Sequence, residues 1–462
     1  MAENKSQIAQ NCQLDRGGLA PLKEDLYVVP SVIAAGLSTL HVIKTVINDN
    51  DGISIPGDFN IHVKLGGVDV SKSPASGFIS PGTHYILVPG TYVLSEDAFI
   101  GYNVSFGGDC DAGGNVILAS GDKKTAIITN DDIPWTPENI PHNIFDLTTD
   151  GDYLYAAGDL VYDGYYKAAI TKLTMGGVIV LTATYEPVLN SKGWWGAVCV
   201  SGNFVYVAGT IIYPTEGFYR AVIQKLNKGD LSLVWEYKFP LQTVDCEMRD
   251  IDVDATDVYG IKETYTGTAI GRVRISIADG SEVWRLGPTT LAGLGMICNG
   301  SNVYLTKGHS PKVIEDITKS SGAETDRTFE SGDFARGVIS GSDLYVCGYW
   351  SNAGVWNPSI HKIDTLTWTQ TWKYADALTN SYYRNCVKDD DGVYGYGVFT
   401  GPLPYLVCVD LDGNLVWKKS IAGGYSCLNG ITQNGSYLYV AFHKSNIGTI
   451  QKRLKSTGEL VS

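Results

Sequence analysis

From about residue 142 to its end at residue 462, the chain repeats a unit of strand-forming sequence. Seven ten-residue segments align without a gap, and each ends in tyrosine: DLTTDGDYLY, AVCVSGNFVY, DIDVDATDVY, GMICNGSNVY, RGVISGSDLY, NCVKDDDGVY and GITQNGSYLY. The seven anchor tyrosines are Tyr155, Tyr206, Tyr259, Tyr304, Tyr345, Tyr394 and Tyr439. They are 51, 53, 45, 41, 49 and 45 residues apart, which is the period of a β-propeller blade.

Each segment alternates apolar and polar residues around a short polar turn, a pattern typical of a β-hairpin. A second hairpin follows in each copy, as in residues 221–239 and 406–420. Two hairpins per copy give four strands. The sequence therefore predicts that residues 142–462 form a seven-bladed β-propeller, with the anchor tyrosines in equivalent second strands.

Composition agrees with an all-β chain and excludes some functions. Glycine (53) and tyrosine (28) are abundant, while charged residues make up only 18%. The net charge of −14 argues against nucleic acid as a partner, since phosphate binding requires a basic face. No run of 18 apolar residues occurs, so we expect no membrane insertion. The nine cysteines include no CxxC pair and leave the redox compartment open.

Residues 1–38 are predicted to form an N-terminal arm whose second half is apolar (LYVVPSVIAAGLSTL, 26–40). The arm covers the protein's own surface, or it docks on a neighbouring subunit by strand addition. In the second case the partner is a copy of the chain or another surface or particle subunit. No signal peptide is visible. The chain is then a mature form, a cytoplasmically made protein, or one assembled inside a cell and released by lysis. We expect an extracellular, cell-surface or virion-associated protein.

Residues 39–132 read as a compact β-domain of alternating strands. The ordered motifs VIKTVINDNDG, VPGTYVLSED, GYNVSFGGDCDAGGNV and GDKKTAIITNDD resemble prealbumin-like (Cna-B/SpaA-type) domains of surface and pilus proteins. The resemblance implies a small Ig-like β-sandwich. It also implies an intramolecular isopeptide bond, for which the matching residues are Lys44, Asn130 and the assisting acid Glu96.

The chemistry of these residues fits such a bond. A lysine among strand hydrophobics is desolvated, which lowers its pKa and makes the neutral amine nucleophilic. A neutral Glu96 would polarise the Asn130 amide. Alternatively, Lys44 points to solvent and Asn130 begins a turn. The chain departs from related sequences at Ala126, where a cysteine often stands opposite GDCD, so that Cys110 lacks this partner.

Residues 133–141 contain three prolines and are predicted to form a semi-rigid linker. In the propeller, tryptophans follow a Gly-containing turn, as in PQQ-like propellers, which the repeats resemble in architecture. These tryptophans are Trp235, Trp284, Trp372 and Trp417. We expect them to pack between blades rather than to hold a quinone, and we predict no cofactor.

The sequence contains no motif of a known catalytic or metal site. The seven histidines lack metal spacing, and no HExxH, nucleophile elbow or phosphate loop occurs. Acidic loops at 48–52, 252–257 and 388–392 invite a calcium interpretation, but Asp, Asn and Gly are also the residues that hairpin turns require. We favour turns and predict neither a metal nor a catalytic residue.

The first strand of a blade lines the central channel, so the residues nine to twelve positions before each anchor tyrosine are expected to ring one mouth. They are Asp146, Trp194, Trp195, Arg249, Asp250, Phe334, Arg336, Tyr382, Tyr383, Arg384 and Asn429. Arginine forks bind carboxylate or phosphate groups, and aromatic faces stack on sugar rings. Six of the residues are therefore candidates for ligand binding: Trp194, Arg249, Asp250, Arg336, Tyr382 and Arg384. Alternatively, the arginines pair with Asp146 and Asp250 and plug the channel.

Two classes of function fit these observations. The first is a non-enzymatic surface or particle protein, in which a stalk-like domain presents a propeller for assembly or for binding an acidic glycan or a protein receptor. The second is a propeller enzyme, a polysaccharide lyase or glycan hydrolase, acting at the channel mouth through carboxylates such as Asp146 and Asp250. The missing catalytic motif favours the first class.

Overall fold

The protein is described here from a computed structural model. It covers residues 36–461 except 51, 136–138, 163, 187–190, 215–216, 241–243, 265–269, 290–292, 309–311, 331, 353, 400–403 and 422–429. The interactions predicted for the apolar half of the N-terminal arm therefore lie largely outside the described residues. One short 3-10 helix, η1 (Pro56–Asp58), interrupts a chain that is otherwise all-β in its described part.

The N-terminal β-domain, which we call the stalk domain, consists of two sheets that enclose one apolar core. One sheet has the order β5-β1-β9-β7, and the other has the order β3-β2-β6-β8 with β4 paired to β2. Side chains such as Leu40 and Val42 of the first sheet meet Ile61 and Val63 of the second. The strands are β1 (Ser38–Ile47), β2 (Asn60–Leu65), β3 (Val68–Asp69), β4 (Ala75–Ser76), β5 (Thr83–Leu87), β6 (Gly90–Glu96), β7 (Tyr102–Gly108), β8 (Asn115–Leu118) and β9 (Lys123–Asp132).

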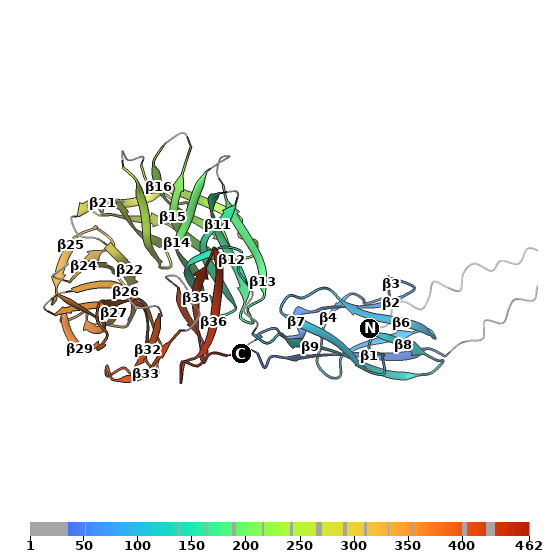
Figure 1. The fold of residues 1–462 in the computed structure, drawn as a ribbon. Helices are drawn as coiled ribbons and strands as arrows, with labels where there is room; N and C mark the ends of the chain where they lie inside the picture. Colours follow the sequence, from blue (N-terminus) through green and yellow to red (C-terminus); the bar gives the residue numbers. More distant parts are fainter. Residues whose placement is uncertain are drawn as a thin grey trace, which may run out of the picture.

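The remaining strands form seven sheets around a central axis, as the repeat predicts (Figure 1). In blades 1 to 6 the four strands follow in sequence order from the axis outward. Blade 1 comprises β10 (Asn143–Thr149), β11 (Tyr153–Tyr162), β12 (Tyr165–Thr174) and β13 (Ile179–Tyr185). Blade 2 comprises β14 (Lys192–Ser201), β15 (Phe204–Ile212), β16 (Tyr219–Asn227) and β17 (Leu233–Lys238). Blade 3 comprises β18 (Cys246–Val253), β19 (Asp257–Thr264), β20 (Ile270–Ser276) and β21 (Glu282–Thr289). Blade 4 comprises β22 (Gly293–Asn299), β23 (Asn302–Lys307), β24 (Val313–Thr318) and β25 (Glu324–Thr328). Blade 5 comprises β26 (Gly332–Ser340), β27 (Asp343–Asn352), β28 (Val355–Asp364) and β29 (Thr369–Ala375). Blade 6 comprises β30 (Ser381–Lys388), β31 (Val393–Phe399), β32 (Tyr405–Val409) and β33 (Leu415–Ser420).

Blade 7 closes the ring with both ends of the propeller chain. It contains β34 (Ile431–Asn434), β35 (Tyr437–Lys444) and β36 (Ile447–Leu454), and β34 and β35 contact β10 of blade 1. The fourth-strand position beside β36 is shared by two short pieces: Ile140 pairs with Gly448, and Leu460 pairs with Arg453. Because the segment before blade 1 joins blade 7, opening the ring requires breaking main-chain hydrogen bonds.

The anchor tyrosines occupy equivalent places, which confirms the prediction. Each lies in the second strand of its blade and is buried, with 0–6% of its surface exposed. The four tryptophans lie between blades. The indole of Trp417, for example, contacts Tyr394 of its own blade, and its Nε1 donates to the Lys455 carbonyl of the next blade at 2.7 Å. Equivalent bonds join Trp235 to Ile277, Trp284 to Lys319 and Trp372 to Leu411.

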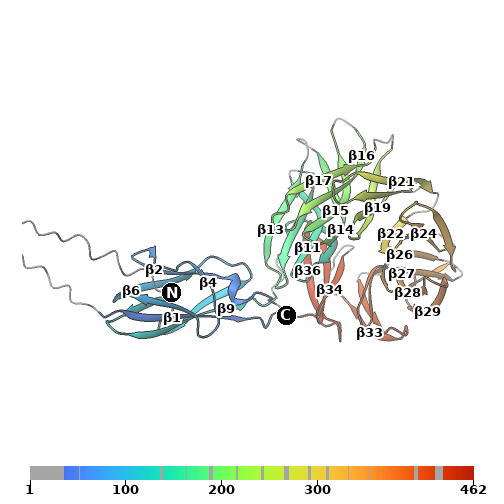
Figure 2. The same ribbon diagram turned by 180° about the vertical axis from the view of Figure 1, so that it is seen from behind.

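The stalk domain meets the propeller at the end of blade 1 where β10 turns into β11 and β12 turns into β13 (Figures 1 and 2). The two parts approach each other too closely for extra side-chain atoms. A Cβ added to Gly101 of the stalk domain would lie 3.1 Å from Thr174 Cγ2 of blade 1, and one added to Gly176 of blade 1 would lie 2.9 Å from the carbonyl oxygen of Ile133. In the linker, Trp135 is 5% exposed and packs between blades 7 and 1 against Tyr439. Burial of this tryptophan fastens the linker to the propeller.

Candidate functional site

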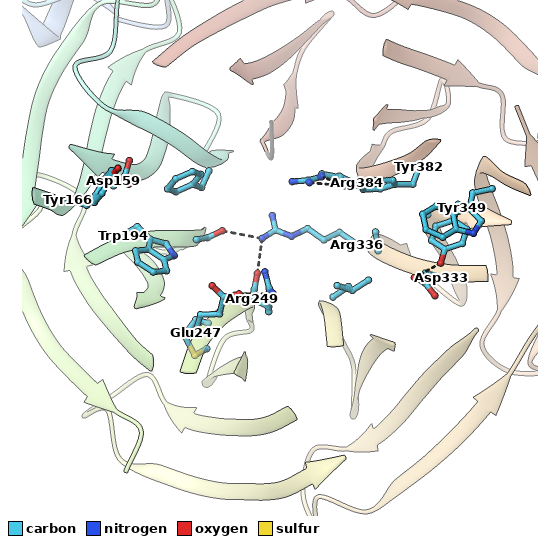
Figure 3. A pocket seen from close by; sticks show the side chains of 17 residues that line it. Asp159, Tyr166, Trp194, Glu247, Arg249, Asp333, Arg336, Tyr349, Tyr382 and Arg384 are labelled. Atoms are coloured by element: carbon cyan, nitrogen blue, oxygen red, sulfur yellow. Dashed lines mark hydrogen bonds and ion pairs between the residues drawn. The ribbon is translucent and has the colours of Figure 1, made fainter. Parts of the chain in front are cut away.

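The opposite end of the channel opens into a cavity of about 840 Å³, which we call the mouth (Figure 3). It is formed where the first strands begin, where second strands end and where third strands begin. The residues lining the mouth are Phe145, Asp159, Tyr166, Trp194, Gly196, Glu247, Met248, Arg249, Leu294, Asp333, Ala335, Arg336, Gly348, Tyr349, Trp356, Tyr382 and Arg384.

A β-bulge recurs in the first strand of blades 1 to 6, ten residues before the anchor tyrosine. The register shifts fall between Ile144 and Asp146 in blade 1, and between Met248 and Asp250 in blade 3. The bulge residues all line the mouth: Phe145, Gly196, Arg249, Leu294, Ala335 and Arg384. A bulge changes the direction in which the extra residue faces. In each of these six blades, that residue therefore faces the mouth, and its identity differs from blade to blade.

Three of the residues expected at the mouth lie elsewhere. Trp195, Phe334 and Tyr383 are at most 1% exposed and pack in the cores between blades. Each of the three stands eleven positions before the anchor tyrosine of its blade. Because side chains alternate along a strand, they point to the opposite side from the residues ten and twelve positions before that tyrosine. Asn429 lies outside the described residues.

Arg336 crosses the channel beneath the mouth. Its Nη1 lies 2.8 Å from Asp146 Oδ1 and its Nη2 lies 3.0 Å from Asp250 Oδ1, so that blade 5 is joined to blades 1 and 3. Burial raises the pKa of Asp250 to about 7, although Arg336 opposes the shift. The guanidinium of Arg336 is thus engaged with both carboxylates, and of the three arginines it alone forms the channel plug with Asp146 and Asp250 among the described residues.

Arg249 and Arg384 line the mouth with different partners. Arg249 Nη2 lies 2.6 Å from Glu247 Oε1, and its Nε lies 2.5 Å from Glu263 Oε2. Arg384 donates to the Tyr382 hydroxyl through Nη2 at 2.8 Å. Arg249 is thus already paired with two carboxylates, while Nη2 of Arg384 bonds a neutral hydroxyl.

Aromatic side chains from the hairpins of blades 1 and 5 line two opposite sides of the mouth, and the sequence analysis did not find them (Figure 3). Tyr349 and Trp356 stack with their ring centroids 4.9 Å apart, and 45% of Trp356 is exposed. Tyr166 holds the position in blade 1 that Trp356 holds in blade 5, eleven residues after the anchor tyrosine, and is equally exposed. The signal was available in the aromatic hairpin tips YDGYY (162–166) and YWSNAGVW (349–356).

Three carboxyl groups face the mouth and were also missed. Asp159 is buried and accepts a hydrogen bond from Asn143 Nδ2 at 2.6 Å, and burial raises its pKa to about 6. Burial likewise raises the pKa of Glu247, with Arg249 opposing the shift. Asp333 accepts a hydrogen bond from the Tyr349 hydroxyl at 2.7 Å. Carboxylate oxygens beside aromatic faces are well suited to accept hydrogen bonds from the hydroxyl groups of a stacked ring.

A second cluster lies inside the stalk domain, where Lys44, Asn130 and Glu96 meet. β1 and β9 are parallel with Val46 opposite Asn130, which turns Lys44 and Asn130 to the same buried face. Lys44 Nζ contacts Asn130 Oδ1 and lies 2.7 Å from Glu96 Oε2, and Asn130 Nδ2 donates to Glu96 Oε1 at 2.6 Å. Burial lowers the pKa of Lys44, and Glu96 opposes the shift. Lys44 is thus held away from solvent.

The acidic loops form turns. Asp254 Oδ1 accepts the backbone N–H of Thr256 at 2.8 Å, and Asp389 Oδ1 accepts that of Asp391 at 2.9 Å. In the 48–52 loop, Asp132 accepts the N–H of Asn50 at 2.8 Å. Carboxylate oxygens of Asp49, Asp131 and Asp132 lie within 4.8 Å of one another there, but the backbone hydrogen bonds account for the position of Asp132 without an ion.

Comparisons with known proteins reach only the fold. No known protein family and no curated protein matches this sequence. Among solved structures, the chain is similar to Kuenenia stuttgartiensis hydrazine synthase, with 13% identity and a TM-score of 0.51 over 67% of this chain and 95% of that chain. It is also similar to the β-propeller domain of Cps50 (Swd1) from Myceliophteria thermophila, with 11% identity and a TM-score of 0.49 over 68% of this chain and 99% of that chain. A third similar structure is the computationally designed protein Ika8, with 10% identity and a TM-score of 0.44 over 68% of this chain and 97% of that chain. No family assignment follows, so the resemblance of residues 39–132 to prealbumin-like domains stays a prediction. Among the described residues, no helix has the length and apolar character to cross a membrane.

Proposed function

We propose that this chain is a non-enzymatic display protein of a cell surface or particle, in which the stalk domain presents the propeller and the mouth binds a carbohydrate. The observation that carries the proposal is the placement of the two ends of the propeller. The stalk domain contacts blade 1 at its Asp152 and Thr174 turns, whereas Asp159 and Tyr166 of the same blade line the mouth at the other end. The mouth therefore faces away from the attachment, where a large ligand has access.

The contents of the mouth support a sugar ligand. Trp356 stacks on Tyr349 and remains 45% exposed, and a platform for a sugar ring requires such an accessible aromatic side chain. Trp194, half-buried, lines the same cavity and contacts Tyr219 with ring centroids 5.5 Å apart. A cavity of about 840 Å³ is large enough for several ring-sized groups.

The Lys44 cluster supports the stalk role, because a covalent link between β1 and β9 would resist pulling on the chain. In the proposed reaction, the neutral Lys44 amine attacks Cγ of Asn130. A C–N bond forms to Nζ, the bond to Nδ2 breaks, and ammonia leaves with a proton that Glu96 relays from the amine. The 2.6 and 2.7 Å contacts of Glu96 place its carboxyl group between donor and leaving group. Assembly through the N-terminal arm, with a copy of the chain or another subunit, completes the proposal.

The test of the carbohydrate ligand is a glycan-array screen of the full chain. Trp356→Ala should lower binding of any glycan found by about tenfold, by analogy with the stacking of nucleic-acid bases on aromatic side chains, which contributes about 1–3 kcal/mol per base. Leu366, 81% exposed in the β28–β29 turn at the other end of the same blade, offers the control Leu366→Ala, which should bind like the wild type. The absence of glycan binding, or equal binding by both variants, would refute the proposal.

One observation favours a second candidate, a glycan hydrolase or lyase. Asp159 and Glu247 both line the mouth, and burial raises the pKa of each, as in the general acid of carbohydrate enzymes. Prolonged incubation with a bound oligosaccharide, followed by mass spectrometry, distinguishes the two candidates. An intact oligosaccharide supports display, while cleavage that is lost in Glu247→Gln would identify an enzyme.

A further inference from the structure

We infer that the mouth selects an uncharged glycan and discriminates against acidic glycans. This inference rests on the proposed carbohydrate-binding function and names the ligand class. It departs from the simplest interpretation of the sequence, in which three arginines gathered at one mouth would attract an anion. The pairing of two of those arginines, Arg249 and Arg336, with carboxylates of the folded chain is what reverses the expectation.

The first argument is that the guanidinium groups of Arg336 and Arg249 are already occupied. Each contacts two carboxylates at 2.5–3.0 Å, so that four carboxylates surround two positive charges. Arg336 Nη2 also donates to the Arg249 carbonyl oxygen at 3.2 Å and to the Gly196 carbonyl oxygen at 3.4 Å, so this nitrogen has acceptors within the protein besides Asp250. A ligand carboxylate or sulfate would have to displace a protein carboxylate, leaving a buried charge without a partner.

The second argument is the charge that remains. Asp159 and Asp333 add two more carboxyl groups to the mouth, against the single further guanidinium of Arg384. Above about pH 7, where Asp159 and Asp250 are largely ionised despite their raised pKa values, the six carboxyl groups of this region outnumber its three guanidiniums among the described residues, in a chain whose net charge is −14. A cavity with low-dielectric walls and a negative balance repels anions at a distance and on contact.

The third argument is what these groups offer an uncharged sugar. Carboxylate oxygens accept hydrogen bonds from sugar hydroxyl groups, and Asp159, Glu247 and Asp333 lie on different sides of the cavity (Figure 3). Trp356 and Trp194 provide aromatic faces that need no charge on the ligand. Recognition by stacking and carboxylate acceptors requires hydroxyl donors on the ligand rather than an acidic group.

The test compares matched oligosaccharides on the full chain by isothermal titration calorimetry. The probes are neutral cello-, malto-, xylo- and mannohexaose and acidic oligogalacturonate, hyaluronan and sialyllactose. At 50 mM salt, at least one neutral probe should bind at least tenfold more tightly than every acidic probe, and the difference should shrink at 500 mM salt because the repulsion is screened. Tighter binding of an acidic probe would overturn the selectivity and leave carbohydrate binding intact. Binding of no probe, together with a blank glycan array, would overturn both.

Glu247→Gln provides an independent check, since it removes one of the two carboxylates that hold Arg249 while keeping the side chain's size. Affinity for an acidic probe should rise several-fold in this variant, while Trp356→Ala should lower the affinity for neutral and acidic probes alike. If Glu247→Gln leaves the ratio of neutral to acidic binding unchanged, carboxylate repulsion is not the source of the selectivity.

Discussion

Arg336 reaches across the propeller channel to Asp146, with Nη1 2.8 Å from Oδ1, and joins blade 5 to blade 1. These residues are 190 positions apart in the chain and stand at the same repeat position, nine residues before their anchor tyrosines. Asp250 of blade 3 holds the other side of the guanidinium. The plug ties three blades together under the mouth and sets the charge that a ligand meets.

Removal of Arg336 should destabilise the propeller strongly. Arg336→Met leaves Asp146 and Asp250 buried without their cation, and breaking a buried ion pair on one side costs about 3–5 kcal/mol. Urea unfolding followed by tryptophan fluorescence measures the loss. Adding Asp146→Asn and Asp250→Asn should recover most of it, because no uncompensated charge then remains. A loss below about 1 kcal/mol in the single variant would argue against a structural role for the plug.

The mass of the intact chain should report the Lys44–Asn130 bond. Loss of ammonia lowers the mass by about 17 Da relative to the sequence, and Lys44→Ala or Glu96→Ala should abolish this deficit. By analogy with other cross-links, closing the 86-residue separation should stabilise the stalk domain by about 4–5 kcal/mol. Lys124→Ala, at a partly exposed lysine of β9, is the matched control and should keep the deficit. A wild-type chain at its full sequence mass contradicts the bond.

Asp159 should make stability depend on pH. Its folded pKa of about 6 exceeds the ordinary aspartate value, so the folded chain binds the proton more readily than the unfolded chain. Its contribution to stability is complete below about pH 4 and is lost as the pH rises through 6. Relative to Asp159→Asn, the wild type should therefore lose about 2–3 kcal/mol of unfolding free energy between pH 4 and 7.5. Asp390→Asn, at a fully exposed aspartate, should give no such trend. A difference that is flat with pH would place the pKa of Asp159 near its ordinary value.

Trp135 should fix the stalk domain to the propeller. Trp135→Ala removes a side chain that is 5% exposed between blades 7 and 1, for which core truncations suggest a cost of about 3–5 kcal/mol. Trp356→Ala is the control, since that indole is 45% exposed and its loss should change stability little. Small-angle scattering should show a broader distribution of stalk-to-propeller distances for Trp135→Ala alone. An unchanged scattering profile would mean that other contacts hold the junction.

The sequence by itself determined the architecture. The spacing of the tyrosines and the two hairpins per repeat specify seven blades, because both signals come from local backbone preference and from the alternation of a strand. The same alternation places Lys44 and Asn130 on inner faces once β1 and β9 are known to be parallel. Strand periodicity and turn composition depend only on residues that are close together in the chain, so both can be recognised from the sequence without knowing the tertiary structure.

Only the tertiary structure decided what the mouth contains. The alignment of the repeats brought Arg249, Arg336 and Arg384 together, but it could not say which carboxylates meet them. Glu263 reaches Arg249 from a second strand, and Asp146 reaches Arg336 from four blades away in the sequence. Ring closure and the recurrent bulge set these distances, and both depend on how the blades pack around the axis. The charge that a ligand meets is therefore a property of the closed ring and not of any one repeat.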